Sequence, residues 1–255
     1  MGKIISITNQ KGGVGKTTTA INLCVSLAVA EKKTLLIDFD PQSNTTTGLG
    51  FRKHEIENSI YDIIINNLPV EDVIMNTSFK YLDLIPAKID LTGAEIELVP
   101  MISRELKLKT SLQPIIDKYD FIIIDCPPSL SLLTINALAA CDSVLVPVQT
   151  EYYALEGISL LMDTIELIKT NLNPDLEIEG ILLTMYDPRT NIAIQVVEEV
   201  QEFFKEKVFK TIIPRNVKLA EAPSFGKPIL LYDYNSKGAK GYLNFAKEII
   251  KGNSE

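Results

Sequence analysis

The chain alternates between short apolar runs and longer stretches in which apolar residues recur at helical spacing. Most of the apolar runs are continuous in isoleucine, leucine and valine, which is typical of parallel strands buried on both faces. The predicted strands are Lys3–Thr8, Thr34–Asp38, Leu82–Pro86, Phe121–Asp125, Val144–Val148, Gly180–Met185 and Thr211–Pro214. The predicted helices are Lys16–Ala30, Glu105–Lys118, Ala154–Thr170, Ala193–Lys205 and Lys240–Lys251. Strands that alternate with helices predict an α/β fold, a doubly wound, mostly parallel sheet with helices on both faces.

Length and composition fit one α/β domain that spans residues 1–255, because no break in the pattern divides the chain. Hydrophobic residues make up 46% of the chain and the mean hydropathy is +0.14, so we expect a substantial core. No apolar run reaches the length of a membrane span, and we expect neither a signal peptide nor a transmembrane segment. Cys24, Cys126 and Cys141 lack C-x-x-C spacing and predict reduced, buried thiols in a cytoplasmic protein.

The net charge is −8 and the sequence pI is about 4.9. Proteins that bind nucleic acids usually present a basic face, so the overall charge argues against an extended surface of that kind. Any contact with DNA would have to come from a local basic patch, including one that is assembled only on dimerisation.

The most informative motif is the glycine-rich segment Gln10–Thr18, Q-K-G-G-V-G-K-T-T, between a predicted strand and a predicted helix. Glycines let the backbone curl around an anion, and the helix adds the positive end of its dipole. Lys16 would reach the β- and γ-phosphates of a nucleotide, and the Thr17 hydroxyl would ligate Mg²⁺. The alternative is a glycine-rich turn without a ligand. The predicted nucleotide-binding residues of this loop are Lys11, Gly12, Gly13, Val14, Gly15, Lys16, Thr17 and Thr18.

The loop departs from the standard G-x-x-x-x-G-K-[ST] pattern at two positions. Gln10 replaces the first glycine, and a second lysine, Lys11, lies five residues before Lys16. A cation inside the loop needs an anion, and Lys16 already serves the loop's own nucleotide. Lys11 can therefore point to a nucleotide held by a second copy of the chain. This arrangement defines the deviant Walker A loop, and the sequence here resembles the ParA/MinD class of ATPases.

Three aspartates lie where predicted strands end. Asp38 and Asp40, in D-F-D-P, close the strand Thr34–Asp38, and strand alternation would aim both side chains the same way. Asp125 ends the strand Phe121–Asp125 and precedes two prolines that would stiffen a switch. Carboxylates at such positions can hold Mg²⁺ through water or orient an attacking water. We predict that Asp125 holds the water shell of Mg²⁺, with Asp38 as a second candidate; the alternative is that these residues only end strands and cap turns.

Pro214–Arg215–Asn216 follows another candidate strand. An amide can read the edge of a base with a donor and an acceptor, and a proline can pack on its face. We therefore predict that Pro214 and Asn216 contact adenine, and the alternative is an ordinary turn.

The resemblance extends through most of the chain and is most specific to ParA/Soj partitioning ATPases. The segments that carry it are G-A-E-I-E-L-V-P (Gly93–Pro100), D-C-P-P-S-L (Asp125–Leu130), E-Y-Y-A-L-E-G (Glu151–Gly157), I-P-R-N-V (Ile213–Val217) and E-A-P-S-F-G-K-P (Glu221–Pro228). This family uses its P-R-N segment at adenine, and the second aspartate of D-x-D-P acts on the hydrolytic water, which corresponds to Asp40. Lys11, Lys16 and Asp40 are the catalytic residues that the resemblance implies.

The resemblance also implies a cycle. ATP drives a homodimer in which Lys11 crosses to the partner's phosphates and Gly12 permits close approach of the two backbones. The dimer binds double-stranded DNA without sequence preference and is associated with the nucleoid. A ParB-type centromere-binding protein stimulates a slow hydrolysis that releases monomers. Some members regulate replication initiation or sporulation, so a replication initiator is a further candidate partner.

In the family, DNA contacts come from scattered basic residues, and the matching positions here are Arg189 and Lys218. The alternatives are solvated surface charges or, for Arg189, a salt bridge within its own loop. Further lysines that could extend the patch are Lys237, Lys240, Lys247 and Lys251.

Two rival functions come from the same class of ATPases. MinD proteins bind membranes through a basic amphipathic C-terminal helix. The apolar stripe of the last helix here consists of Tyr242, Leu243, Ala246, Ile249 and Ile250. We expect this stripe to pack on the core, because the helix is short and only Gly252–Glu255 follows it, so membrane binding is not expected. The second rival is a carrier of an iron–sulfur cluster, as in nitrogenase iron protein.

Overall fold

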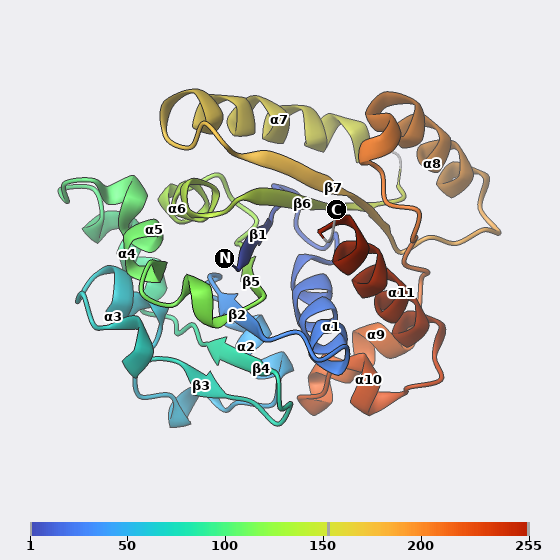
Figure 1. Ribbon diagram of the computed structural model, residues 1–255. Coiled ribbons are helices and arrows are strands. Elements are labelled where there is room, and N and C mark those ends of the chain that lie inside the picture. The colour runs from blue at the N-terminus through green and yellow to red at the C-terminus, as the bar shows by residue number, and fades with distance from the viewer. Residues whose placement is uncertain (1, 152–153, 254–255) are drawn as a thin grey trace.

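The computed structural model describes residues 2–151 and 154–253. Within these residues, seven strands form one sheet in the order β3-β4-β2-β5-β1-β6-β7 (Figure 1). The strands are β1 (Lys3–Ile7), β2 (Thr34–Asp38), β3 (Met75–Asn76), β4 (Leu82–Ile85), β5 (Phe121–Asp125), β6 (Ser143–Gln149) and β7 (Glu177–Thr184). The pairings are parallel except for the short antiparallel contact between β3 and β4. The predicted mostly parallel sheet is confirmed.

Helices cover both faces of the sheet, as the doubly wound prediction requires (Figure 1). The α-helices are α1 (Lys16–Val29), α2 (Asn44–Gly48), α3 (Ile60–Ile64), α4 (Leu91–Glu97), α5 (Lys107–Leu112), α6 (Leu132–Ala140), α7 (Ala154–Asn171), α8 (Asn191–Phe204), α9 (Val217–Glu221), α10 (Ile229–Tyr232) and α11 (Lys237–Gly252). Short 3-10 helices are η1 (Lys53–Glu55), η2 (Val70–Asp72), η3 (Arg104–Leu106), η4 (Ile116–Lys118), η5 (Lys205–Lys207) and η6 (Ala222–Phe225). Helices α3–α8 pack on one face, and α1 and α9–α11 pack on the other.

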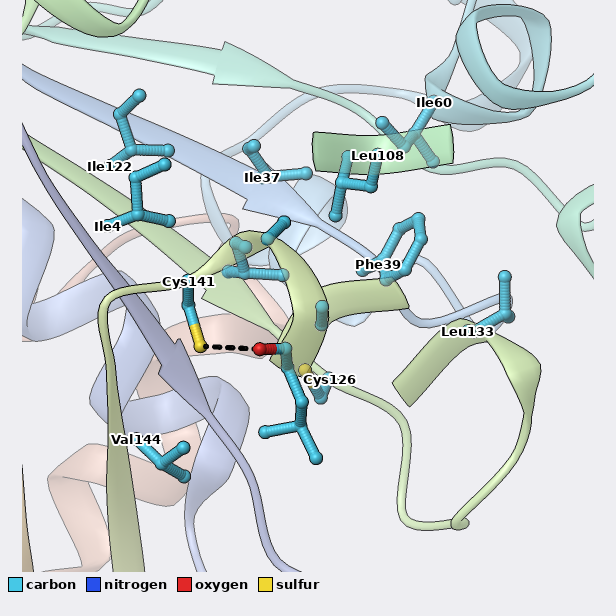
Figure 2. Packing of buried hydrophobic residues seen from close by; sticks show 14 of the residues in the cluster. Ile4, Ile37, Phe39, Ile60, Leu108, Ile122, Cys126, Leu133, Cys141 and Val144 are labelled. Atoms are coloured by element: carbon cyan, nitrogen blue, oxygen red, sulfur yellow. Dashed lines mark hydrogen bonds between the residues drawn. The ribbon is translucent and has the colours of Figure 1, made fainter. Parts of the chain in front are cut away.

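Adjacent residues of each strand point into different cores. Ile4 and Ile37 belong to the core beneath α3–α8, which Figure 2 shows together with Leu108 of α5. Ile5 and Leu36, their neighbours in the chain, belong to the core beneath α1 and α11. Because both faces are buried, the strands contain few polar residues, which explains the continuous apolar runs in the sequence. Burying one such side chain contributes about 1.5–3 kcal/mol.

The predicted strand Thr211–Pro214 is wrong. The segment runs beside β7 but joins it through isolated bridges, Ile181 with Val208 and Tyr186 with Pro214. The reason lies in α11, because the backbone N–H groups of Lys210 and Thr211 donate to the Glu248 carboxylate at 2.7 and 3.0 Å instead of to a strand. The seventh strand of the described sheet is instead β3, which is too short to show a pattern.

The predicted helix Glu105–Lys118 is also incorrect as a continuous element. It is divided into η3, α5 and η4. Pro114 lies between α5 and η4 and has no N–H to continue a helix, which accounts for the break. Helix α6 was not predicted, because its sequence is apolar on nearly all sides and shows no helical period.

Two further expectations can be compared with the structure. Cys24, Cys126 and Cys141 are free and buried. Across residues 2–151 and 154–253, no helix is both long enough and apolar enough to cross a membrane. The segment Glu151–Gly157 and the chain end Gly252–Glu255, quoted from the sequence, lie partly outside the described residues.

Candidate functional site

The glycine-rich loop joins the end of β1 to the start of α1 at the centre of the sheet. Gly13 and Gly15 have φ values of 77° and 91°, in the left-handed region that glycine adopts without steric cost. Gly15 is the N-cap of α1, so the helix begins directly behind the loop. A Cβ added to Gly12 or Gly13 would meet no atom within 4 Å, which leaves this side of the loop open. An open loop in front of a helix N-terminus fits a phosphate group.

Side chains from outside the loop hold it at both ends. The Asn9 amide donates from Nδ2 to the Pro147 carbonyl at 2.8 Å, and its Oδ1 accepts the Lys11 N–H at 3.0 Å. At the other end, Thr184 Oγ1 donates to the Val14 carbonyl at 2.8 Å. The loop is therefore tied to the ends of β6 and β7, and not only to its own strand.

Lys16 closes the loop from within. Its Nζ donates to the Lys11 carbonyl at 3.1 Å, and the residue is buried. Burial lowers the pKa of Lys16, whereas the charges of Asp125, and more weakly of Asp40, raise it. The ammonium group therefore lies within electrostatic range of both carboxylates, and its role at a phosphate stays a prediction.

Asp125 interacts electrostatically with this lysine and has one carboxylate oxygen without a hydrogen-bond partner in the described part of the chain. It ends β5, where it pairs in register with Ile7 of β1 and with Asp38 of β2. Its Oδ2 accepts the Thr45 hydroxyl at 2.6 Å, whereas its buried Oδ1 has no hydrogen-bond partner among the described residues. Burial raises the pKa of Asp125 to about 6, against the lowering effect of the Thr45 and Thr17 hydroxyls.

The donor set fits Mg²⁺, which prefers carboxylate and hydroxyl oxygens and retains several waters. An unpaired buried carboxylate oxygen is costly unless a cation or its water occupies the position. Among the described residues, no group of three or more histidine, cysteine, aspartate or glutamate side chains forms a metal site by itself. Such a site suits an ion that water and the phosphates of a nucleotide also coordinate.

Asp38 and Asp40 have different surroundings. Asp38 Oδ2 accepts the N–H and the hydroxyl of Thr46 at 2.8 and 2.6 Å, and Oδ1 accepts the Asp40 N–H at 3.3 Å. Burial and the nearby Asp125 charge raise the pKa of Asp38 to about 7. Both of its oxygens thus anchor α2 and the D-F-D-P turn, and its role at a metal stays a prediction. Asp40 accepts the Gln42 N–H at 2.9 Å through Oδ1.

A cavity of about 300 Å³ lies beside the loop. Among its lining residues are Gly15, Thr18, Thr184, Pro214, Asn216 and Tyr242. The structure therefore brings the phosphate loop together with the Pro214–Asn216 segment, two parts that are about 200 residues apart in the sequence. Thr184 and Tyr242 were not predicted here, because Tyr242 was assigned only to the apolar stripe of the last helix.

Asn216 has a structural task besides any contact with a base. It is the N-cap of α9, and its Oδ1 accepts the Lys218 N–H at 2.8 Å. Its Nδ2 makes no hydrogen bond to any described residue. The donor end of the amide is therefore the part that is available to a ligand in the cavity.

The two residues predicted to contact DNA both lie on the surface and are both paired. Arg189 is 85% exposed and forms an ion pair with Asp187, with Nη2 2.6 Å from Oδ2. Lys218 pairs with Glu221 at 3.1 Å. The salt bridge considered as the alternative for Arg189 is therefore present, and its contact with DNA stays a prediction.

Most of the apolar side of α11 is buried against α1. Of the predicted stripe, Tyr242, Ala246 and Ile249 are at most 2% exposed, whereas Leu243 and Ile250 are only partly buried. Phe245, which was not assigned to the stripe, is also fully buried. The Tyr242 and Thr19 hydroxyls are 3.1 Å apart. An anchor helix would need this face for lipid, so its burial speaks against the MinD-like function. The burial of all three cysteines likewise speaks against a cluster held between two protomers.

Comparisons with known proteins identify the relatives of this chain. A family model described as an AAA domain matches residues 2–178. The sporulation initiation inhibitor protein Soj of Bacillus subtilis is 61% identical over 249 residues, which cover 98% of each chain. The chromosome partitioning protein ParA of Myxococcus xanthus is 59% identical, over 98% of this chain and 89% of that protein.

A solved structure extends the comparison to the fold. Cobyrinic acid a,c-diamide synthase from Mycobacterium smegmatis, with bound ADP and magnesium, superposes with a TM-score of 0.88 at 33% identity. The match covers 100% of this chain and 96% of that one. The identity to Soj and ParA, 61% and 59% against 33% for the synthase, decides between these relatives, and this chain belongs to the ParA/Soj family of chromosome-partitioning ATPases.

Proposed function

We propose that this chain binds ATP with Mg²⁺ and hydrolyses ATP to ADP and phosphate as a switch in DNA segregation. The observation that carries the proposal is the buried Asp125 Oδ1, which lacks a hydrogen-bond partner in the part of the chain that the structure describes, on a carboxylate within electrostatic range of the buried Lys16. An orphan carboxylate oxygen and a loop lysine in one place fit a magnesium nucleotide. The cavity beside Pro214 and Asn216 then accepts the base.

The roles of the residues follow from their chemistry. Lys16 neutralises phosphate charge, and Lys11 does the same for the nucleotide of a partner subunit. Thr17 and Asp125 hold the metal ion, Asp125 through water, with Asp38 as the second candidate. When bound, Mg²⁺ neutralises the charge that develops on the phosphate oxygens. Asp40 orients the attacking water, and the backbone of Gly12–Thr18 binds the phosphates.

The same proposal includes the partners. ATP favours a homodimer over the monomer, and the dimer binds double-stranded DNA non-specifically through Arg189 and Lys218. A ParB-type centromere-binding protein accelerates the slow hydrolysis, and a replication initiator is a further partner to test. ATP acts as a switch because it binds the dimer more tightly than it binds the monomer. The membership of the chain in the ParA/Soj family supports these assignments.

Sedimentation tests the proposal directly. The protein is mixed with plasmid DNA or, separately, with anionic liposomes, each with ATP or with ADP. Asp40→Ala is used in parallel to retain the ATP state. Pelleting with DNA only in ATP supports the switch. Pelleting with liposomes and not with DNA would replace it with a membrane-positioning function.

A further inference from the structure

Arg189 and Asp187 form a bidentate pair on the loop that follows β7. Arg189 Nε donates to Asp187 Oδ1 at 2.9 Å, and Nη2 donates to Oδ2 at 2.6 Å. The side chain of Asp187 is only 17% exposed, whereas that of Arg189 is 85% exposed. The guanidinium holds the pKa of Asp187 well below its usual range, so the carboxylate is charged at neutral pH. The guanidinium N–H groups of Arg189 that would bind a DNA phosphate therefore already bind the Asp187 carboxylate.

Lys218 has a similar partner on α9. Its Nζ donates to Glu221 Oε2 at 3.1 Å, and the same oxygen accepts the Tyr232 hydroxyl at 3.0 Å. The ammonium group lies 5.5 Å from the centre of the Tyr232 ring. Tyr232 thus holds the carboxylate in place beneath the lysine.

The two pairs lie on adjoining segments of the fold. Tyr186 donates its N–H to the Ile213 carbonyl at 3.1 Å, and its own carbonyl accepts the Arg215 N–H at 2.9 Å. These bonds join the loop of Arg189 to the segment that leads into α9. The charge of Arg215 also contributes to the low pKa of Asp187. The loop that carries the first pair is therefore hydrogen-bonded to the segment that leads to the second.

We propose that Asp187 and Glu221 compete with DNA phosphates for Arg189 and Lys218 and thereby limit the affinity and lifetime of the DNA complex. The inference rests on the proposed DNA binding and adds its regulation. Phosphate oxygens need the same donors as a carboxylate, and each pair has no net charge until the carboxylate is displaced. The displaced carboxylate then stays near the phosphate and repels it. Weak contacts of this kind favour release of DNA once ATP is consumed.

The test replaces each carboxylate by its amide, which keeps the size and removes the charge. Asp187→Asn and Glu221→Gln are titrated into a fluorescein-labelled duplex of random sequence, with Mg²⁺ and a non-hydrolysable ATP analogue, at several salt concentrations. Each variant should bind about two- to fivefold more tightly at low salt, the range that surface ion pairs span. The slope of log K against log salt should steepen by up to about one unit.

Glu71→Gln is the matched control. Glu71 forms an exposed pair with Lys118 at 3.3 Å, on η2 next to β3, which is the opposite edge of the sheet from β7. The control makes the same change in net charge and should leave DNA affinity unchanged. In a second control, Asp187→Asn is combined with Arg189→Ala. The gain in DNA affinity should disappear, because the guanidinium for which carboxylate and phosphate compete is absent.

The outcomes separate the competition from the proposed function. Weaker binding by Asp187→Asn would mean that the carboxylate positions Arg189, which overturns the competition. Tighter DNA binding by Glu71→Gln would mean that the effect comes from net charge, and this would overturn the competition as well. The same holds if Asp187→Asn still tightens binding when Arg189 is replaced by alanine. If Arg189→Ala weakens DNA binding but neither Asp187→Asn nor Glu221→Gln strengthens it, the competition is excluded and the proposed DNA binding stands. Failure of the unmodified chain to bind DNA with the analogue removes the proposed function and the competition together.

Discussion

The hydroxyl of Tyr242 lies 3.1 Å from Thr19 Oγ1, so the last helix of the chain is hydrogen-bonded to the helix that follows the phosphate loop. Both residues are buried, and Tyr242 also lines the cavity beside Pro214 and Asn216. The helix that was compared with a membrane anchor thus contributes to the proposed nucleotide site. Helix α11 is an integral layer of the fold.

Removing one partner of this hydrogen bond should destabilise the protein. We expect Tyr242→Phe to lower the free energy of unfolding by about 1 kcal/mol, because the Thr19 hydroxyl loses its buried partner. Thr19→Val combined with Tyr242→Phe should recover part of the loss, since no polar group is then left unpaired. Urea denaturation measures both. Tyr234→Phe, at a tyrosine that is 62% exposed, is the control and should change nothing.

Gly12→Val should separate nucleotide binding from dimerisation. A Cβ at Gly12 meets no atom of its own protomer within 4 Å, so the loop itself accommodates the side chain. We expect ATP to bind while the protein stays monomeric, because the side chain would obstruct the partner. Light scattering with ATP checks this, and a dimer peak would contradict it. Gly13→Val is the contrast, because Gly13 has a φ of 77° and the variant should lose ATP as well.

Asp40 allows its charge to be separated from its role in the turn. Asp40→Ala should bind ATP and accumulate as a dimer but release phosphate at least about 100-fold more slowly, the usual scale for loss of a general base. Asp40→Asn retains an acceptor for the Gln42 N–H, which Asp40 now accepts at 2.9 Å. It should be equally inactive if the charge matters. Recovery of phosphate release in Asp40→Asn would assign the residue to the turn and not to catalysis.

At Asn216, the capping of α9 can be separated from the proposed contact with the base. Asn216→Asp keeps the oxygen that caps α9 but replaces the Nδ2 donor, so we expect normal unfolding in urea and roughly tenfold weaker ATP binding, which is about one lost hydrogen bond. Asn216→Ala should lose the cap as well, and with it about 1 kcal/mol of stability. Titration with a fluorescent ATP analogue gives the affinities. Unchanged affinity in Asn216→Asp would place the base elsewhere.

The sequence predicts the elements whose pattern is local. Six strands and the phosphate loop follow from apolar runs and glycine spacing, and the sheet aligns their carboxyl ends. The strand Thr211–Pro214 fails because the Thr211 N–H at its start bonds to Glu248, a residue of the distant α11. No local pattern can report such a competitor.

The site shows the same division between local and long-range contacts. Lys16, Asp40 and Asp125 stand in motifs, and the structure places them together. The Thr45 and Thr46 hydroxyls that hold two aspartates were not identified, because N-T-T-T resembles an ordinary polar turn. The partner of Arg189 is only two residues away in the chain, yet sequence spacing alone does not distinguish a salt bridge from a solvated charge.

The five-residue helix α2 joins three neighbouring strand ends through two threonines. Thr45 donates to Asp125 of β5, and Thr46 donates to Asp38 of β2. Thr46 Oγ1 also accepts the N–H of Ala87, just beyond β4, at 3.1 Å. A valine would match either threonine in shape but would sever these links. One short helix therefore positions the carboxylates of both Asp38 and Asp125, and a displacement of α2 would move the two together.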